Sequence, residues 1–452
     1  MHRRIFLLWL AAAILPAASP SKLPPVRFTD TRLENGLRVI IAEDRYAPVF
    51  GIAVSYAVGS KDERAGRTGF AHLFEHMMFK GSKNVGAGEH FYLIFNNGGS
   101  MNGTTNTDRT LYFEVLPKNQ LDLALFLEAD RMRSLDVTKE NLENQRQAVK
   151  EERRLRLDNQ PYGQTNERTT ELAYDNFAYK HSVIGSMEDL DAASVEDVHD
   201  FFRTYYAPNN AVLALVGDLD TKQTLAKVKQ YFADIPRQEP PKPVDLSEKP
   251  QTAERRERIE DRLARLPRLD ILYKVPPGNH PDTAALYVMN SILASGESSR
   301  LYQKIVKEKE AAAQIFGFVD DRMGPGVYRL IAIVRPGKSP EEVESLISEE
   351  IARLHSEPVT EKELLRARSS VRRAAVGSRT SSLGRAIRLA DDAVMFNDPG
   401  RINTLPETRM AVTSAQIQQA IKAHLKNANR TVIVTVPAAR AAAGQPKQGE
   451  RQ

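Results

Sequence analysis

The chain has 452 residues, of which 41% are apolar and 27% are charged, a balance typical of globular proteins and not of disordered ones. This length predicts more than one domain. The 63 basic and 58 acidic residues give a net charge of +5, and no basic stripe interleaved with aromatic residues is present, so nucleic acid is not an expected partner. Because the chain has no cysteine, its stability must come from its cores and not from disulfides.

The N-terminus has the pattern of a secretory signal. Basic residues at His2-Arg3-Arg4 precede an apolar run from Ile5 to Leu15, which is too short to span a bilayer. Small residues follow, so we expect a signal peptide over residues 1–18 and a periplasmic or secreted protein. No later stretch is long and apolar enough to cross a membrane, so no membrane span is expected after signal removal.

Residues 26–235 are expected to form the N-terminal, catalytic domain. The glycine-rich residues 98–103 are expected to be irregular. An Asn35-Gly36 turn signal precedes the first strand. Hydrophobic periodicity predicts further strands at 49–58, 110–116 and 211–216, and helices at 68–80, 89–95, 120–135, 138–157, 194–206 and 221–233.

A proline-rich stretch divides the chain. Residues 236–250 hold five prolines and several charges, and we interpret residues 236–260 as a linker. Residues 261–437 are expected to form a second, non-catalytic domain, and residues 438–452 a disordered tail. The second domain has helix and strand runs at 268–275, 284–295, 299–310, 326–334 and 340–354, and a long helix from Glu361.

A faint internal repeat links the two domains. The stretches that begin at Ser194 and Thr413 align without gaps, and each reads as a capped amphipathic helix, a turn with asparagine and a hydrophobic strand. Coincidence is the alternative, because helix–turn–strand units are common. With the linker midway, the repeat favours two domains of one α+β design.

The stretch from Phe70 to Phe79 carries His72, Glu75 and His76 among apolar residues. In a helix, positions four apart lie on one face, so the two imidazoles can bind one metal ion from the same side. Neutral imidazole suits Zn²⁺, and Glu75 can reach a water beside the metal. A hydrogen-bonded core histidine is the alternative, but here several buried polar groups need partners at once.

Two histidines leave a catalytic zinc site one protein ligand short. The helix expected at 138–157 offers Glu151 and Glu152, and a helical wheel sets Glu152 near the centre of the apolar arc and Glu151 beyond its edge. A buried Arg–Glu pair is the alternative use of Glu152. The arc is defined by Leu142, Ala148, Val149 and Leu155.

The motif H-x-x-E-H, followed 76 positions later by Glu152, resembles that of the pitrilysin/insulinase family of zinc peptidases, which includes mitochondrial processing peptidase and bacterial two-subunit relatives. The likeness extends from Leu33 to about Pro437. Other segments that carry it are Gly69–His72, Phe79–Ser82, Met101–Thr105, Asp108–Thr110, Val149–Arg154, Ile184–Ser186 and Ser298–Tyr302.

The resemblance implies one Zn²⁺ per chain, bound by His72, His76 and Glu152, with Glu75 as the general base of a zinc-dependent endopeptidase. It implies an α+β fold of two similar domains, each a mainly antiparallel sheet covered by helices, that together form half of a clamshell. It also assigns substrate binding by strand addition to an edge strand beside the metal, over Asn102, Gly103, Thr104 and Thr105.

The sequence departs from the family pattern at two points. Gln145 stands where several relatives carry a second glutamate, two helical turns before the ligand. Single-chain relatives also carry an arginine and a tyrosine, seven residues apart, in the C-terminal half, and here Val306 and Ala313 stand there instead. Arg300 and Tyr302 lie nearby but belong to a separate Ser-Arg-Leu-Tyr motif. The resemblance therefore implies a homologous, metal-free partner subunit that supplies the arginine and tyrosine. The alternative is that this chain uses other donors and works as a homodimer.

Two other functions stay open from sequence alone. The chain could be a non-peptidase structural or processing subunit of the same architecture, although such subunits typically lose the motif residues that are intact here. It could also be a binding protein that stores zinc, in which case Glu75 would have no role. Zinc content measured alongside hydrolysis of a fluorogenic peptide separates these alternatives, because zinc without hydrolysis, with any partner present, would favour storage or a structural role.

Overall fold

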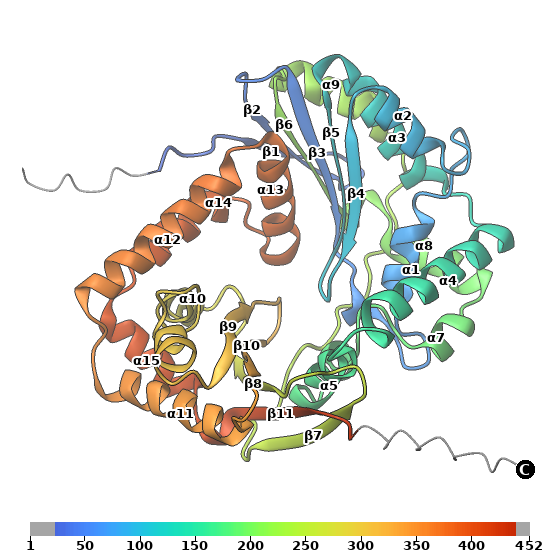
Figure 1. The fold of residues 1–452 in the computed structure, drawn as a ribbon. Coiled ribbons are helices and arrows are strands. Elements are labelled where there is room, and N and C mark those ends of the chain that lie inside the picture. The colour runs from blue at the N-terminus through green and yellow to red at the C-terminus, as the bar shows by residue number, and fades with distance from the viewer. Residues whose placement is uncertain (1–22, 440–452) are drawn as a thin grey trace, which may run out of the picture.

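Two β-sheets, each covered by helices, make up the computed structural model, which describes residues 23–439 (Figure 1). The expected signal peptide and all but the first two residues of the expected tail lie outside the described residues. No helix among the described residues is long and apolar enough to cross a membrane. The α+β class and the two similar units are as the sequence analysis expected.

The N-terminal sheet has six strands in the order β1-β2-β6-β3-β5-β4, so β4 is an edge strand. Strand β6 runs parallel to β2, and the other neighbours are antiparallel. The strands are β1 (Thr29–Arg32), β2 (Arg38–Glu43), β3 (Val49–Tyr56), β4 (Ser100–Thr105), β5 (Thr110–Pro117) and β6 (Ala211–Gly217).

The first part of the chain also carries nine α-helices among its described residues. Those at 163–191 were not foreseen from the sequence. The helices are α1 (Phe70–Met77), α2 (Glu89–Asn96), α3 (Leu121–Ser134), α4 (Lys139–Arg153), α5 (Gly163–Ala173), α6 (Phe177–Lys180), α7 (Met187–Asp191), α8 (Val195–Tyr205) and α9 (Thr221–Phe232).

The C-terminal sheet has five strands in the order β7-β11-β8-β10-β9. Residues 255–260, at the end of the expected linker, belong to β7 and pair in parallel with β11. The expected runs at 268–275 and 326–334 coincide with β8 and β10. The strands are β7 (Arg255–Asp261), β8 (Arg268–Val275), β9 (Ala312–Asp320), β10 (Gly326–Val334) and β11 (Arg430–Pro437).

Helices cover the inner face of this second sheet and extend from it. The helix expected from Glu361 begins there, after Thr360 accepts a hydrogen bond from the backbone N–H of Glu363. The segment expected at 299–310 contains a π-helical turn, η5 (Tyr302–Glu308). The α-helices are α10 (Pro281–Leu293), α11 (Pro340–Ser356), α12 (Glu361–Arg379), α13 (Ser382–Phe396), α14 (Arg401–Met410) and α15 (Ser414–His424).

The internal repeat is confirmed as a structural repeat. Ser194 and Thr413 both cap their helices with a capping box, and α8 and α15 both have 11 residues. Each helix leads through a single 3-10 turn, η4 (Pro208–Asn210) or η6 (Asn427–Asn429), into an interior strand of its sheet. Strands β6 and β11 then take equivalent positions, parallel to one neighbour and antiparallel to the other.

The prediction that residues 98–103 are irregular was wrong for most of the segment, because β4 pairs with β5 in continuous register from Ser100 to Thr105. The glycines suggested a loop, but one of them has a packing role in the strand. A Cβ on Gly103 would lie 2.9 Å from Oε1 of Glu75 and 3.0 Å from its Cγ. Glycine thus permits the strand to approach α1 closely.

Each sheet has its outer face covered by a helix from the other half of the chain. In Figure 1, α13 lies against the N-terminal sheet and α5 lies beside the C-terminal one. Helix α13 contributes Ala386, Leu389, Ala390 and Ala393 to an apolar cluster with outer-face residues such as Ala53 and Ala214. Helix α5 meets its sheet through a 2.6 Å hydrogen bond between the hydroxyls of Thr165 and Thr435, and its Ala173 joins an apolar cluster with Leu272 and Val327.

The packing of α13 against the N-terminal sheet depends on a glycine in β3. A Cβ on Gly51 would lie 2.5 Å from Cα and 2.7 Å from N of Leu383, which are backbone atoms and cannot rotate away. We therefore expect Gly51→Ala to destabilise the protein by about 1–3 kcal/mol through overpacking. In Gly377→Ala, the matched control on α12, the added Cβ meets nothing within 4 Å. That variant should be neutral or slightly stabilising in thermal unfolding, and equal midpoints for the two would contradict the prediction.

Candidate metal centre

Helix α1 lies on the inner face of the N-terminal sheet and is anchored at its N-terminus by Glu63. The two carboxylate oxygens of Glu63 accept hydrogen bonds from the backbone N–H groups of Gly69 (2.9 Å) and Ala71 (2.8 Å). A carboxylate is favoured there because the helix end presents unpaired N–H groups and a positive partial charge. His181 contacts the same carboxylate at 2.9 Å. The register of the motif helix is thus fixed before its first histidine.

The three residues expected to bind zinc lie together. Oε2 of Glu152 is 3.6 Å from Nε2 of His72 and 3.3 Å from Nε2 of His76. One donor atom from each residue fits within a 4.8 Å group. Both separations exceed the usual range of an N–H···O hydrogen bond. Two donors that each lie about 2.0–2.1 Å from a tetrahedral zinc ion are themselves roughly 3.3 Å apart, so the spacing fits that ion.

The electrostatics of the trio also suit a divalent cation. Burial, with His76 as the next contribution, lowers the pKa of His72 to about 4, so its imidazole is neutral at pH 7. The close approach of His76 is the largest of the effects that hold the pKa of Glu152 below its usual range. Two imidazoles and one carboxylate are the ligand set of several catalytic zinc sites.

Helix α4 brings Glu152 to α1, against which it packs. Its buried stripe is Leu142, Gln145 and Val149, and Glu152 continues that stripe at the same helical spacing. Glu151 is exposed and pairs with Arg154 at 3.1 Å. The expected arc was wrong at Ala148 and Leu155, which are both exposed. The helix changes to a π turn, η3 (Arg154–Asp158), directly after Arg153, and a helical wheel does not anticipate that change.

The π turn has a second consequence at the centre. Nη1 of Arg156 lies 2.6 Å from Oε1 of Glu152, so one oxygen of this carboxylate faces a guanidinium and the other faces the histidines. The guanidinium is otherwise largely exposed. Sequence reasoning missed this contact, although the i, i+4 spacing of the pair is the signal that could have indicated it.

Glu75 makes its side-chain hydrogen bond to the edge strand β4, not to His72, His76 or Glu152. Oγ1 of Thr105 donates a 2.6 Å hydrogen bond to its Oε2, and Gly103 lies against its side chain. Burial raises the pKa of Glu75, and the hydrogen bond from Thr105 opposes that rise. This carboxylate is therefore fixed in position by β4, close to the trio, without contributing to it.

The four residues expected to bind substrate all lie on β4 and divide into two sets. Gly103 and Thr105 face α1 and contact Glu75. Asn102 and Thr104 are exposed on the other face, and Thr104 accepts a 2.9 Å hydrogen bond from Arg109. Since β4 ends the sheet, one side of its backbone has no neighbouring strand among the described residues.

A second His–Glu cluster lies deeper in the same half and was not foreseen. His90, Glu114 and Glu128 bring their donor atoms within 4.8 Å, and Nε2 of His90 is 2.8 Å from Oε1 of Glu114. The buried guanidinium of Arg131 pairs with Glu128. This guanidinium supplies the positive charge that a bound cation would otherwise bring to the cluster. The signal was Glu114, a charged residue among inward-facing positions of an otherwise apolar strand.

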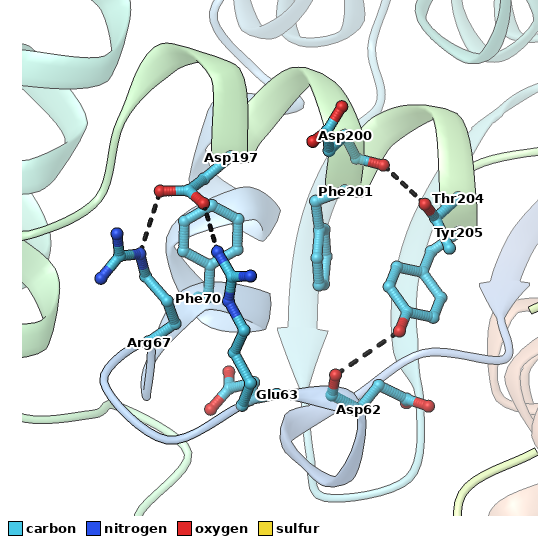
Figure 2. Close-up of a pocket in the computed structure, with 10 residues that line it drawn as sticks. Asp62, Glu63, Arg67, Phe70, Asp197, Asp200, Phe201, Thr204 and Tyr205 are labelled. Carbon is cyan, nitrogen blue, oxygen red and sulfur yellow. Dashed lines mark hydrogen bonds and ion pairs between the residues drawn. The ribbon is translucent and has the colours of Figure 1, made fainter. Parts of the chain in front are cut away.

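A pocket of about 200 Å³ opens on the far side of α1, between the helix start and α8 (Figure 2). Asp197 joins Arg64 and Arg67 there at 2.7 and 2.9 Å, and Phe70 and Phe201 line the pocket between charged groups. His72, His76 and Glu152 do not line it. Its ion pairs hold the loop that precedes α1 to α8, so we interpret it as part of the support of the motif helix.

Comparison with known proteins identifies the family. Residues 38–186 match the model described as insulinase (peptidase family M16), and residues 192–371 match that of the peptidase M16 inactive domain. The zinc protease PqqE of Helicobacter pylori is 32% identical over 336 residues, which cover 74% of this chain and 76% of that protein.

Solved structures agree with this match. The crystal structure of a protease from Helicobacter pylori has a TM-score of 0.88 and 28% identity, and the match covers 92% of this chain and all of that chain. The periplasmic protease PqqL of Escherichia coli shares the fold, with a TM-score of 0.74 and 18% identity, over 92% of this chain but 48% of its own. The chain with the His72–Glu75–His76 helix belongs to the insulinase family of zinc peptidases, peptidase family M16.

Proposed function

We propose that this protein is a zinc-dependent endopeptidase that hydrolyses peptides or small unfolded proteins. The observation that carries the proposal is the convergence of three metal donors from two helices, with a fixed carboxylate beside them and an open sheet edge next to that carboxylate. A bound zinc ion supplies Lewis acidity, which favours ionisation of water near neutral pH. His72, His76 and Glu152 would hold it.

In this proposal Glu75 holds and moves protons. Its carboxylate takes a proton from the attacking water and later delivers one to the amine that leaves. Thr105 fixes the position of Oε2, and the close contact of Gly103 restricts rotation of the side chain, so the base does not need to reorganise during the reaction. Gln145, buried one helical turn before Val149, is not charged and so adds no second carboxylate to this region.

Strand β4 supplies a binding mode for an extended peptide. Its unpaired backbone edge can add a substrate strand, which would run beside Gly103 and bring a peptide bond close to Glu75. The exposed side chains of Asn102 and Thr104 are available for contact with substrate side chains on one face. Binding through the backbone favours unfolded substrates over folded ones, because a folded protein rarely offers an unpaired extended strand.

We further propose that the chain acts as the catalytic subunit of a heterodimer. Val306 is buried within the core of the C-terminal half, and Ala313 lies exposed on the edge strand β9. Neither side chain can donate a hydrogen bond to a developing oxyanion. A homologous, metal-free subunit that carries arginine and tyrosine would complete the site. The match to only 48% of the PqqL chain supports a second unit of similar size.

A periplasmic or secreted location fits the expected signal at residues 1–18 and the periplasmic origin stated for PqqL. Two alternative functions remain testable against the peptidase: a structural subunit without activity, and a zinc-storage protein. The contact from Thr105 favours the peptidase, because a storage site would not require a fixed carboxylate beside the ligands.

Glu75→Gln tests the role of the base. We expect cleavage to fall by about 10²–10⁴-fold while zinc stays bound, because the amide keeps the shape of the side chain but cannot accept the proton. Peptide hydrolysis and metal content measured on the same sample would decide. Glu151→Gln is a matched control that should keep both. Activity of Glu75→Gln within about tenfold of the unmodified enzyme would refute the assignment.

Glu152→Gln tests the third ligand. We expect its zinc affinity to fall by more than the roughly 10–100-fold that loss of an outer hydrogen-bond partner typically costs, because a neutral amide replaces an anionic donor. Glu151→Gln should bind zinc as before, since Glu151 is exposed and faces Arg154. Competition with a chelating dye gives both affinities without any assay of turnover. Loss of zinc from the Glu151 variant alone would reverse the two assignments.

The need for a partner is tested with the zinc-loaded chain alone and then with a homologous metal-free chain encoded beside it. We expect little turnover alone, because the oxyanion lacks donors that are often worth about 3–4 kcal/mol each, and turnover on addition of the partner. Mutation of the partner's arginine or tyrosine should remove the gain. Full turnover by this chain alone, whether as a monomer or a homodimer, would rule the heterodimer out.

A further inference from the structure

Residues 106–109 form the turn between β4 and β5, at the end of the strand whose Thr105 binds the carboxylate of Glu75. It follows Thr105 directly, and Thr105 makes the 2.6 Å contact to the carboxylate. The turn is tight: Oδ1 of Asn106 accepts hydrogen bonds from the backbone N–H groups of Asp108 and Arg109, each at 2.8 Å. A shift of this turn would therefore move Thr105 and disturb the position of Glu75.

Arg109 joins this strand to the C-terminal half. Its Nη1 donates to both the carbonyl oxygen and the hydroxyl of Thr104, each at 2.9 Å. Its Nε and Nη2 donate to the two carboxylate oxygens of Asp391 on α13, at 2.9 and 3.3 Å. One planar guanidinium thus binds the end of β4 and a helix 282 residues away in sequence.

The neighbouring residue of the turn makes a second, separate contact with the C-terminal half. Asp108 is 1% exposed and accepts a 3.0 Å hydrogen bond from the backbone N–H of Met323, in the turn between β9 and β10. It also accepts a 2.8 Å hydrogen bond from the hydroxyl of Tyr179, and that hydroxyl accepts one from the N–H of Gly324. Two adjacent residues therefore bind two different elements of the far half.

Another ion pair between the halves shows what is specific to Arg109. Arg385, also on α13, pairs with Asp44 after β2, and both side chains are about as buried as those of Arg109 and Asp391. The Arg385 pair docks the helix but does not contact β4. The Arg109 pair docks the same helix and in addition holds the backbone and hydroxyl of Thr104.

We propose that Asp391 is a positioning residue for the active-site edge strand: it orients Arg109, which in turn fixes β4 and the Thr105–Glu75 contact. An edge strand has backbone partners on one side only and is freer to move than a central strand. Charge-assisted hydrogen bonds at its end reduce that freedom. The inference rests on the proposed peptidase function for its purpose, but the ordering of β4 can be measured without turnover.

The test is hydrogen–deuterium exchange of the full zinc-loaded chain, followed in peptides that cover residues 99–106 and, for comparison, the central strand β6. We expect Asp391→Asn to accelerate exchange in residues 99–106 by about tenfold or more and to leave β6 unchanged. Asp391→Glu keeps the carboxylate and should restore most of the protection. Arg109→Lys keeps a positive charge toward Asp391 but loses the fork that reaches Thr104, so it should resemble Asp391→Asn.

Arg385→Gln is the matched control, because it removes the other ion pair of α13 and leaves the contacts of Arg109 intact. Its exchange in residues 99–106 should stay as in the unmodified chain, even if its thermal midpoint falls as far as that of Asp391→Asn. Unchanged exchange at β4 in Asp391→Asn, or equal acceleration in Arg385→Gln, would overturn the proposal. Should Asp391→Asn not fold, Arg109→Lys and Arg385→Gln make the same comparison.

A kinetic measurement on the assembled enzyme separates this inference from the proposed function. If peptide cleavage is present, Asp391→Asn should alter KM and kcat together, since β4 both receives substrate and holds the base, while Arg385→Gln should alter neither by more than about twofold. If no cleavage is found in any variant, the proposed function fails while the exchange result still decides the role of Asp391.

Discussion

The burial of strand β6 on both faces is the constraint on which the rest of the molecule depends. All seven of its residues are buried, so the N-terminal sheet needs an apolar layer on each side. The inner layer comes from local helices, α1 among them. The outer layer is α13, which the chain reaches only after four of the five strands of the C-terminal sheet. Each sheet has one face covered by a helix from the other half, so the half that carries His72, His76 and Glu152 packs against a helix of the C-terminal half.

This exchange of helices brings distant residues to the candidate metal centre. The centre forms at the open edge of the sheet, where α1, α4 and β4 meet, and not at the middle, where both layers are closed. An open edge can receive a substrate strand, but it is also the least constrained part of a sheet. Contacts from Asp391 and Met323 reach this edge because α13 and the β9–β10 turn were brought beside it by the packing of the two halves.

Sequence reasoning succeeded where information is local. The H-x-x-E-H helix, the capped helices at Ser194 and Thr413 and the burial of Val149 all follow from periodicity and caps within one element. It failed where tertiary contacts decide. Strand β4 looked like a glycine loop because the reason for Gly103 is a side chain on another element. Leu155 was misplaced by a π turn, and the partner of Arg109 lies 282 residues away, where one sequence gives no signal.

Because the two domains are similar, α10 and α1 can be compared to see which buried polar groups the fold itself does not require. Helix α10 follows β8 as α1 follows β3, and both cover the inner face of equivalent sheets. The buried residues of α10 are apolar apart from Thr283, so this layer of the fold needs no ionisable group. Burial of the carboxylate and the two histidines of α1 thus costs desolvation free energy that an apolar helix at this position would not incur. The proposed zinc ion and the proposed reaction would account for these groups in α1, whereas the buried residues of α10 serve packing against their own sheet.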